Sequence, residues 1–361
     1  MFKSKKIIKS VLKIVGIALL SVVVFCFLLV GLLTVTEYKP KSIENVKIND
    51  NVSNPISLNT SYTALSWNIG YGALGDNADF FMDGGTMVTS STKERVVSNL
   101  KDMANVLKSQ NPDLIFLQET DLKSKRSHYV NEVAFFQSNL SSYDSNYVPN
   151  YKVLYVPYPF PTIGKVNCGL STFSRFDITQ SQRYALPCPF KYPFRLCNLK
   201  RALSVNRIPV EGSNKELVMI NLHLEAYDSG EGKIAQTKML KKLLEEETKK
   251  GNYVIAAGDF NQSFSNVDIS MYPLIGEDFW APAFIDVNDF DDSLLFVTDN
   301  TVPSCRSLDK PYLGSDKSNF QYYLIDGFIV SDNINIEEIS TIDLQFVSSD
   351  HNPLRLKFKL D

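Results

Sequence analysis

Eight polar residues lie at or near the ends of apolar runs in this sequence, and together they could bind a cation and move protons. Burying a polar side chain among apolar ones costs free energy unless the side chain is paired or has a function. Strand ends in a layered fold converge on one rim, so residues far apart in sequence can meet there. We therefore expect one site that contains Asn68 in LSWNIG, Glu119 in FLQETD, His223 in NLHLE, Asp259 and Asn261 in AAGDFNQ, Asp326 in LIDGFIV, and Asp350 with His351 in SSDHNP.

The donor atoms of this set favour a hard cation. The set contains four carboxylates, two amides and two imidazoles, and oxygen ligands suit Mg²⁺, Mn²⁺ or Ca²⁺. A zinc site would instead want clustered His or Cys with local spacing such as HExxH, which is absent from the sequence. Mg²⁺ usually takes one or two protein carboxylates and keeps water and substrate phosphate as its other ligands. The set therefore favours Mg²⁺ or Mn²⁺ and the hydrolysis of a phosphate ester.

Histidine is scarce in the chain, yet two of its three copies lie in these motifs. An imidazole held by a carboxylate can carry a proton and stabilise charge on a phosphate. Each motif alone has a plain structural explanation: the histidine of NLHLE could be a satisfied structural residue, DFN could be a turn, and QE at a strand end is unremarkable. Their joint occurrence in this order favours a site.

Short apolar runs and two helical patterns must position these residues. The helical spacing of apolar residues predicts a helix over 93–109, with Ser91 and Glu94 as a capping box, and a second helix over 233–250 that stops at Gly251. Strands covered by helices predict layered sheets. The candidate strands are YTALSWNI, DLIFLQE, ELVMINLHL, NYVIAAGDF, YLIDGFIV and LRLKFKL.

The N-terminal region predicts a membrane segment. Residues 14–36 carry no charge, are apolar all round, and are long enough to cross a hydrocarbon core of about 30 Å at about 1.5 Å per residue. We favour a retained anchor over a cleaved signal peptide, because no Ala-x-Ala site follows the run. Five lysines precede it, which places residues 1–13 in the cytoplasm and the rest of a single-pass protein outside. Cleavage of the segment would instead release a secreted protein.

The remaining composition is that of a globular protein. Of 361 residues 44% are hydrophobic, which excludes a disordered chain. Beyond the leader, 32 basic residues stand against 40 acidic ones, which counts against a protein that coats duplex nucleic acid and less against a metal-dependent nuclease. Cys188 and Cys197 could close a short loop as a disulfide or remain free thiols. Residues 37–60 are polar and predict a stalk, and one domain follows over 61–361.

Taken in order, WNIG, QE, NLH, GDFN, IDG and SDHNP resemble the motifs of the endonuclease/exonuclease/phosphatase superfamily, over about residues 61–361. The resemblance implies an α/β fold, a four-layer αββα sandwich preceded here by one transmembrane helix. It also implies roles. Glu119 resembles the principal Mg²⁺ ligand, and Asn68 resembles the amide that supports metal and water. Asp259 resembles the carboxylate that orients or deprotonates the attacking water, and Asn261 resembles an amide bonded to the phosphate.

The same resemblance extends to the other polar motif residues. His223 matches a phosphate-contacting or acid position, and His351 resembles a second catalytic imidazole that is oriented by Asp326. Asp350 stands where the family adds a carboxylate near the metal. The resemblance does not fix which group is the general base.

Weaker candidates for substrate binding lie in other segments. Asn167 in VNCGLSTFSR could touch substrate or be a polar residue at a strand edge. Arg126 and His128 follow the QE strand, where a basic residue could contact substrate or lie in a solvated loop. Arg306 precedes the IDG strand and could bind a phosphate.

Three functions remain open from the sequence. The first is an extracytoplasmic nuclease, and the second is a phosphodiesterase or phosphatase acting on a lipid headgroup or a small phosphoester. The segments VPYPFPTIGKV and LPCPFKYPFRLC could form a lipid-facing rim for the second, or be rigid surface crossings. The third is a binding protein that has lost catalysis, which the presence of every motif residue argues against. No protein partner is implied.

Overall fold

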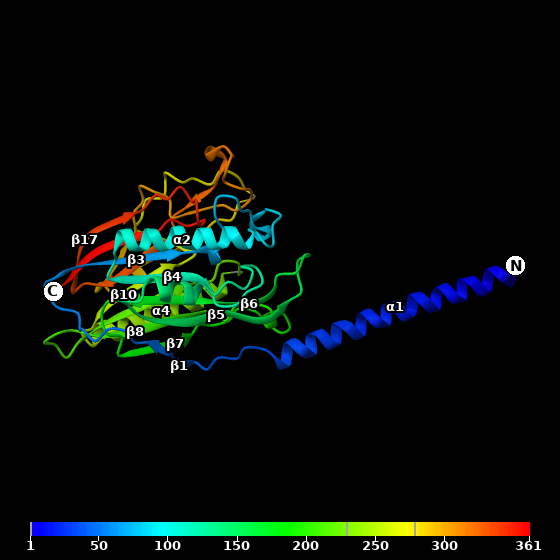
Figure 1. Ribbon diagram of the computed structural model, residues 1–361, viewed down its shortest axis with the longest axis horizontal. Coiled ribbons are helices and arrows are strands. Elements are labelled where there is room, and N and C mark those ends of the chain that lie inside the picture. Colours follow the sequence, from blue (N-terminus) through cyan, green and yellow to red (C-terminus); the bar gives the residue numbers. More distant parts are fainter. Residues whose placement is uncertain (1, 229, 278) are drawn as a thin grey trace.

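The computed structural model describes residues 2–228, 230–277 and 279–361 (Figure 1). Within these residues the α-helices are α1 (Phe2–Val35), α2 (Lys93–Gln110), α3 (Glu132–Asn139) and α4 (Glu231–Lys249). One seven-stranded sheet has the order β1 (Ile43–Asn45), β7 (Gln180–Ala185), β8 (Ala202–Pro209), β9 (Glu216–His223), β10 (Tyr253–Asp259), β16 (Asp326–Ser331) and β13 (Leu294–Val297). The second has the order β17 (Ile334–Thr341), β18 (Leu354–Leu360), β3 (Ser61–Asn68), β4 (Leu114–Asp121), β6 (Gly164–Ser174), β5 (Asp144–Val156) and β2 (Ile48–Asn49).

Shorter elements complete the chain. Two further strand pairs are β11 (Gln262–Phe264) with β12 (Ala283–Ile285), and β14 (Cys305–Arg306) with β15 (Tyr322–Tyr323). Single 3₁₀ turns occur at Gly70–Gly72, Phe81–Asp83, Phe194–Leu196, Val287–Asp289 and Lys317–Asn319.

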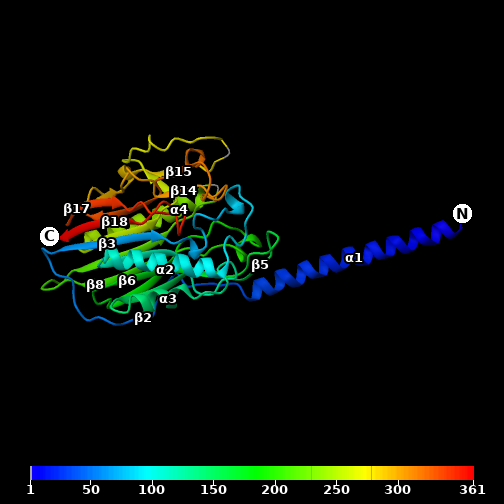
Figure 2. The same ribbon diagram turned by 45° about the horizontal axis from the view of Figure 1, so that its top comes forward.

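The two large sheets pack face to face and form the centre of the domain. Phe116 of β4 and Phe328 of β16 meet between them, with ring centroids 6.3 Å apart. α2 covers the outer face of the second sheet, where Leu100 is buried against β3 and β4, and Figure 2 shows α2 lying over this sheet. α4 covers the outer face of the first sheet through Leu240 and Leu244. The predicted four-layer αββα sandwich is confirmed.

The predicted strands and helices are present, with one difference at a helix end. All six candidate strands form, as β3, β4, β9, β10, β16 and β18, and the two helical patterns become α2 and α4. The N-cap of α2 is Thr92, whose hydroxyl accepts a hydrogen bond from the Arg95 N–H. The predicted cap, Ser91, instead donates to the carbonyl of Ala73. The Ser91 hydroxyl is therefore used in a tertiary hydrogen bond, and the neighbouring Thr92 caps the helix.

α1 and the segment after it link the N-terminus to the sandwich. α1 is long and apolar enough to span a membrane or to serve as a signal sequence, and its most apolar window has none of its residues buried in the protein. The segment 37–60, expected to be a stalk, adds a short strand to the edge of each sheet, since β1 pairs with β7 and β2 pairs with β5. Strands of two and three residues leave no alternating pattern that the sequence could reveal.

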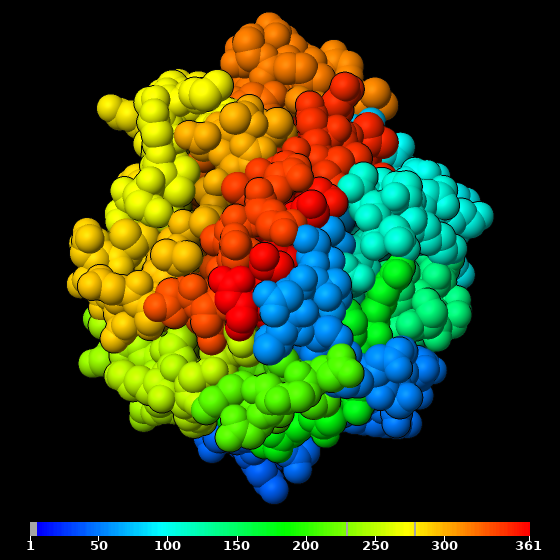
Figure 3. All heavy atoms as spheres, turned by 90° about the vertical axis from the view of Figure 1, so that its left-hand side faces the viewer, coloured from blue at the N-terminus to red at the C-terminus, as the bar shows by residue number. Residues whose placement is uncertain are grey.

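The register of the central strands brings the motif residues to one end of the sandwich. β9 and β10 run parallel, so His223 lies beside Asp259, and β16 runs antiparallel, so Asp326 lies on the other side of Asp259. β3 and β4 belong to the facing sheet and run parallel to each other, so their last residues lie at the same end of that sheet. Figure 1 shows that α1 projects from the opposite end to the C-terminus. Figure 3 views that C-terminal end, where the start of β3 and the end of β18 lie side by side.

Glu247 joins α4 to the sheet below it, and we expect it to stabilise the fold in a pH-dependent way. Its carboxylate accepts hydrogen bonds from Arg207 at 2.7 and 3.1 Å, from Asn252 at 2.7 Å and from Lys250 at 2.8 Å. Burial acts to raise the pKa of Glu247, but these bonds outweigh it and lower the pKa to about 2. Glu247→Gln should reduce the free energy of unfolding by about 1–2 kcal/mol at pH 7.

The pH dependence of that loss follows from the direction of the shift. Because the folded-state pKa of Glu247 is below its ordinary value of 4.5, its contribution to stability is complete above pH 4.5 and disappears as the pH falls toward 2. Urea unfolding at pH 7 and pH 3 measures the difference. The control Glu246→Gln removes only a pair with Lys242 on the exposed face and should cost less than about 0.5 kcal/mol. An equal loss for Glu247→Gln at both pH values would contradict this role.

Candidate active site

Asp259 is the centre of a buried polar cluster at the strand ends. The amide Nδ2 of Asn68 donates to Asp259 Oδ2 at 3.0 Å, which connects the two sheets. Nε2 of His223 lies 3.4 Å from the same oxygen, and Nε2 of His351 lies 3.8 Å from it. The main-chain N–H of Asn261 donates to Asp259 Oδ1 at 2.8 Å. The structure therefore brings together motif residues that the sequence separates by almost three hundred positions.

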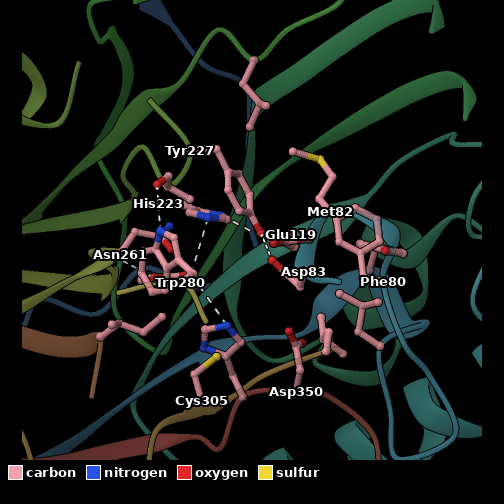
Figure 4. A pocket seen from close by; sticks show the side chains of 18 of the residues that line it. Phe80, Met82, Asp83, Glu119, His223, Tyr227, Asn261, Trp280, Cys305 and Asp350 are labelled. Atoms are coloured by element: carbon pink, nitrogen blue, oxygen red, sulfur yellow. Dashed lines mark hydrogen bonds and ion pairs between the residues drawn. The ribbon is translucent and has the colours of Figure 1, made fainter. Parts of the chain in front are cut away.

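Glu119 enters the same site through an irregularity in β4. The register of β4 against β6 shifts between Leu117 and Thr120, and Glu119 has a positive φ of 56°. This bulge turns the Glu119 side chain out of the ladder, so that Oε1 lies 3.4 Å from the Nδ2 of Asn68. Its side chain is 22% exposed, more than that of Asp259. Figure 4 shows Glu119, His223, Asn261 and Asp350 directed toward one cavity.

His351 is fixed on the opposite side of the cluster by Asp326. Its Nδ1 lies 2.8 Å from Asp326 Oδ2, and the indole of Trp67 donates to its main-chain carbonyl at 2.9 Å. The Ser349 hydroxyl donates to the carbonyl of Asn68 at 2.8 Å and accepts from the His351 N–H at 3.2 Å. This arrangement leaves Nε2 as the ring atom of His351 that faces Asp259.

The two histidines have opposite charge preferences. Burial, followed by the nearby Arg201 guanidinium, lowers the pKa of His223 well below 6.5. Burial also acts to lower the pKa of His351, but the Asp326 carboxylate outweighs it and raises that pKa well above 6.5. Burial therefore favours the neutral imidazole of His223, and the Asp326 carboxylate favours the imidazolium form of His351. Pairs of titratable groups whose pKa values are shifted in opposite directions are typical of sites of acid–base catalysis.

Two carboxyl groups in the cluster have pKa values that are raised toward neutral pH. Burial, with repulsion from Asp326 as the next cause, raises the pKa of Asp259 to about 7. Burial likewise raises the pKa of Asp350 to about 6. A bound cation would lower both values, because it favours the ionised carboxylates.

The donor set fits a hard cation. Asp259, Asp326 and His351 form one group whose ligand atoms lie within 4.8 Å of one another, and Cys305, Asp350 and His351 form another. Glu119 and Asp350 line the same cavity and add carboxylate oxygens to it, with Glu119 Oε1 4.0 Å from Nδ1 of His223. Asn68 Oδ1 accepts from the Gly70 N–H, and the NH₂ group of Asn68 faces the site. Its geometry suits a group that holds carboxylates better than a direct ligand.

The cavity around the cluster has a volume of about 520 Å³ and an aromatic wall. Tyr227, Trp280 and Phe80 line it together with the polar cluster (Figure 4). The Tyr227 hydroxyl donates to Asp83 Oδ1 at 2.7 Å and joins two loops across the cavity. A volume of this size accommodates a small phosphoester or a headgroup.

The weaker sequence candidates occupy different environments. Arg126 lines the cavity, stacks on the Tyr71 ring at 3.5 Å, and lies 3.2 Å from Asp121 and 3.9 Å from Glu119. Arg306 also lines the cavity, but its guanidinium donates to the carbonyls of Ser307 and Gly75, so it holds loops together.

Asn167 and His128 are not brought into the cluster. The Asn167 side chain accepts a bond from Tyr147 at 3.3 Å, and the His128 ring bonds the carbonyl of Ser91 at 2.6 Å. Neither residue is among those that line the cavity. Cys188 and Cys197 are free thiols.

Several cavity residues were missed by the sequence reasoning. Arg201 is buried beside His223, donates to its carbonyl at 3.0 Å and pairs with Glu225 at 3.3 Å. Tyr227 and Trp280 come from loops. Cys305 lies at the site because its main chain forms an isolated antiparallel β-bridge with that of His351. The one available signal was Glu225, two residues after His223 in NLHLE, since a second buried charge at a strand end needs a partner.

Three solved structures show the same fold. An endonuclease/exonuclease/phosphatase from Beutenbergia cavernae is 15% identical, with a TM-score of 0.53 over 83% of this chain and 72% of that one. A family protein from Leptotrichia buccalis is 14% identical, with a TM-score of 0.53 over 83% and 100% of the two chains. TDP2 from D. rerio, complexed with a single-strand DNA product, is 14% identical, with a TM-score of 0.50 over 83% and 100%. No curated protein matches the sequence.

The family itself is shown by a sequence model. The model described as the endonuclease/exonuclease/phosphatase family matches residues 65–351, most of the chain and nearly all of the sandwich. That span begins in β3 and ends at His351, so it includes the whole polar cluster. This protein belongs to the endonuclease/exonuclease/phosphatase family.

Proposed function

We propose that this protein is a Mg²⁺- or Mn²⁺-dependent hydrolase of phosphate esters, and that it acts as a phosphodiesterase through in-line attack by water. The observation that carries the proposal is the convergence of Asn68, His223 and His351 on one carboxylate, Asp259, inside a cavity. Membership of a family of nucleases and phosphatases supports the same reaction class.

Asp259 and the residues around it would perform the proton chemistry. Asp259 is positioned to accept a proton from water, and the Asn68 and Asn261 bonds fix the orientation of its two oxygens. The charged His351, held by Asp326, would stabilise negative charge on the phosphate or protonate the leaving group. The neutral His223 would donate a hydrogen bond to a phosphate oxygen. Nδ2 of Asn261 donates to the Leu224 carbonyl and keeps a second N–H for the phosphate.

Glu119 and Asp350 would hold the cation. When bound, Mg²⁺ or Mn²⁺ supplies Lewis-acid polarisation of a phosphoryl oxygen. Arg126, 3.9 Å from Glu119, would add positive charge beside the phosphate. We assign to Asn68 the task of holding Glu119 and Asp259 at a fixed separation.

Two substrate classes remain for the proposal. A phosphoester in a lipid headgroup or a small molecule fits the cavity of about 520 Å³, and the net negative charge of the domain counts against a long polyanion. A nucleic acid is the second candidate, because the similar D. rerio TDP2 is complexed with a single-strand DNA product. We further propose that α1 anchors the protein in a membrane with the catalytic domain outside the cytoplasm. The substitution Glu119→Gln can be used to test the cation site.

Chelated wild-type protein should be inactive on bis(p-nitrophenyl) phosphate, and added Mg²⁺ or Mn²⁺ should restore hydrolysis. Glu119→Gln replaces one anionic ligand with a neutral one and should lower the rate by about 10²–10³-fold at the same metal concentration. Mg²⁺ should also raise the melting temperature of the wild type by about 2–4 °C but not that of Glu119→Gln. The exposed Glu246→Gln serves as control. Hydrolysis that survives chelation would contradict the metal requirement.

A further inference from the structure

Two loops beside the cavity carry exposed aromatic residues, and we call them together the aromatic rim. They are residues 157–163, between β5 and β6, and residues 186–201, between β7 and β8. Phe160 is 86% exposed and Phe194 is 73% exposed, and Tyr158 and Tyr192 are also largely exposed. Exposed aromatic side chains gathered in neighbouring loops mark an interaction surface.

The aromatic rim is attached to the end of α1. The Tyr192 hydroxyl lies 3.3 Å from the Thr34 hydroxyl in the last turn of the helix. Glu37, just after the helix, pairs with Arg195 at 3.2 Å and with Lys200 at 3.5 Å. Because Thr34 belongs to the uncharged run that would cross a membrane, Tyr192 lies at the depth where that run ends. Tyrosine and tryptophan are enriched at this level of a bilayer.

The aromatic rim also borders the mouth of the cavity. Ile163, Phe190 and Leu199 of the rim line the cavity. Tyr158 packs edge-on against Phe81, with ring centroids 6.3 Å apart, and the neighbouring Met82 lines the cavity as well. Figures 1 and 2 both show the loop after β5 extending from the end of the domain where α1 departs. One surface therefore connects the end of the helix with the entrance to the site.

The charge of the aromatic rim differs from that of the rest of the domain. Neither loop contains an acidic residue, and Lys191 and the part-exposed Arg195 lie among the aromatic residues of the loop 186–201. Lys200 is instead mostly buried beside Glu37, and Arg201 is buried against Glu225. The chain beyond the leader has an excess of acidic residues. Basic residues between exposed aromatic ones complement anionic headgroups, and the aromatic rings suit the boundary between headgroups and acyl chains.

We propose that the aromatic rim docks onto the bilayer that holds α1, turns the mouth of the cavity toward it, and selects phosphate esters in the headgroups of that membrane. This rests on the proposed function and on insertion of α1. A single helix would tether the domain but leave its orientation free. Four aromatic side chains at a second point of contact fix the orientation and bring the site to headgroup depth.

Docking is measured without reference to activity. Phe160→Trp and Phe194→Trp are made in the full chain and reconstituted in vesicles of phosphatidylcholine and phosphatidylserine that contain brominated lipid. The tryptophan fluorescence that each variant shows in excess of the wild-type protein should be quenched by the brominated lipid. Leu295→Trp is the matched control, because Leu295 is exposed on the edge strand β13 opposite Val330, at the end of β16 remote from Asp326. Quenching no stronger in the two rim variants than in the control would overturn the docking surface.

Selection of a lipid substrate is measured with the double substitution Phe160→Ser/Phe194→Ser. Neither side chain lines the cavity, so hydrolysis of soluble bis(p-nitrophenyl) phosphate should stay within about twofold of the wild type. Hydrolysis of vesicles of phosphatidylcholine, phosphatidylserine and sphingomyelin should fall by at least about tenfold. Equal rates on the vesicles would overturn the selection of headgroup esters.

The two proposals fail in different ways. If wild-type protein hydrolyses neither substrate while the fluorescence of Phe160→Trp and Phe194→Trp is still quenched, the proposed function is wrong and the docking surface is supported. Wild-type protein that hydrolysed only the soluble ester, or DNA, would keep the phosphoesterase and overturn the lipid substrate.

Discussion

Asp259→Asn is expected to lower the rate of phosphodiester hydrolysis by about 10²–10⁴-fold, the usual contribution of a positioned base. Asparagine preserves the size of the side chain, but its single oxygen can accept only one of the two bonds that Asp259 receives from the Asn68 amide and the Asn261 N–H. It cannot accept a proton from water. The rate is measured on bis(p-nitrophenyl) phosphate at saturating Mg²⁺, with the exposed Asp332→Asn as control. A loss of less than tenfold would remove Asp259 from the centre of the proposed mechanism.

The same substitution should remove a pH-dependent destabilisation of the metal-free protein. The pKa of Asp259 is raised from 3.8 to about 7, so its ionisation favours the unfolded chain, where the carboxylate is in water. This penalty is absent below pH 3.8, grows as the pH rises, and is complete above about pH 7. Asparagine removes it. The difference in melting temperature between Asp259→Asn and wild type, both without metal, should therefore favour Asp259→Asn more at pH 8 than at pH 4, where the lost hydrogen bond is the remaining effect.

An Asp259→Asn protein that is inactive and equally destabilised at pH 4 and pH 8 would contradict this account. Loss of activity would then follow from loss of structure, and the carboxylate would contribute to the fold through its hydrogen bonds. Gain of stability with loss of activity is instead the signature of a group retained for function.

His351→Ala is the second substitution with a large expected effect, a loss of about 10²–10⁴-fold in hydrolysis rate. It removes the imidazolium that faces Asp259 and leaves the Asp326 carboxylate without its partner at 2.8 Å. Because a buried unpaired carboxylate costs free energy, His351→Ala should also reduce stability by about 1–3 kcal/mol. His351→Gln retains a donor for Asp326 and should be inactive but closer to wild type in stability. Circular dichroism during urea unfolding separates the two effects.

A pH profile distinguishes a role in catalysis from a purely structural role for this pair. The Asp326 carboxylate raises the pKa of His351, and burial alone would lower it. If the imidazolium is the active form, activity is lost as the pH rises through the pKa of His351. Asp326→Asn should therefore move the alkaline limb of the rate profile to lower pH. An unchanged alkaline limb would exclude His351 as the titrating group.

The elements that position the site could be predicted because their sequences are unambiguous. Strands such as β9 and β10 are buried on both faces and read as continuous apolar runs, and the polar residue at the end of each run, His223 or Asp259, marks the rim. α3 was missed, because its eight residues include Phe135 and Phe136 side by side and give no helical spacing. The short strands β1 and β2 were missed because pairing with β7 and β5, which is tertiary, determines them.

The part of the site that comes from strand ends was predicted, and the part that comes from loops was not. Regular pairing forces Asp259 and Asp326 to be neighbours once β10 and β16 are adjacent. No such rule places Tyr227 or Trp280, because loop conformation depends on contacts distant in sequence. Arg306, which the sequence suggested could bind a phosphate, lines the cavity, but its contacts with main-chain carbonyls could not be read from the sequence.

The central claim is that this cluster hydrolyses phosphate esters with a divalent cation, and one comparison of rates tests it most directly. Purified wild type and Asp259→Asn are assayed in parallel with Mg²⁺ or Mn²⁺ on DNA, RNA, phospholipids, sphingomyelin, inositol phosphates and nitrophenyl esters. Turnover of at least one substrate by wild type, lost on chelation and absent in Asp259→Asn, is the predicted result. Folded wild type without metal-dependent turnover of any of them, or equal turnover by both proteins, would contradict the claim.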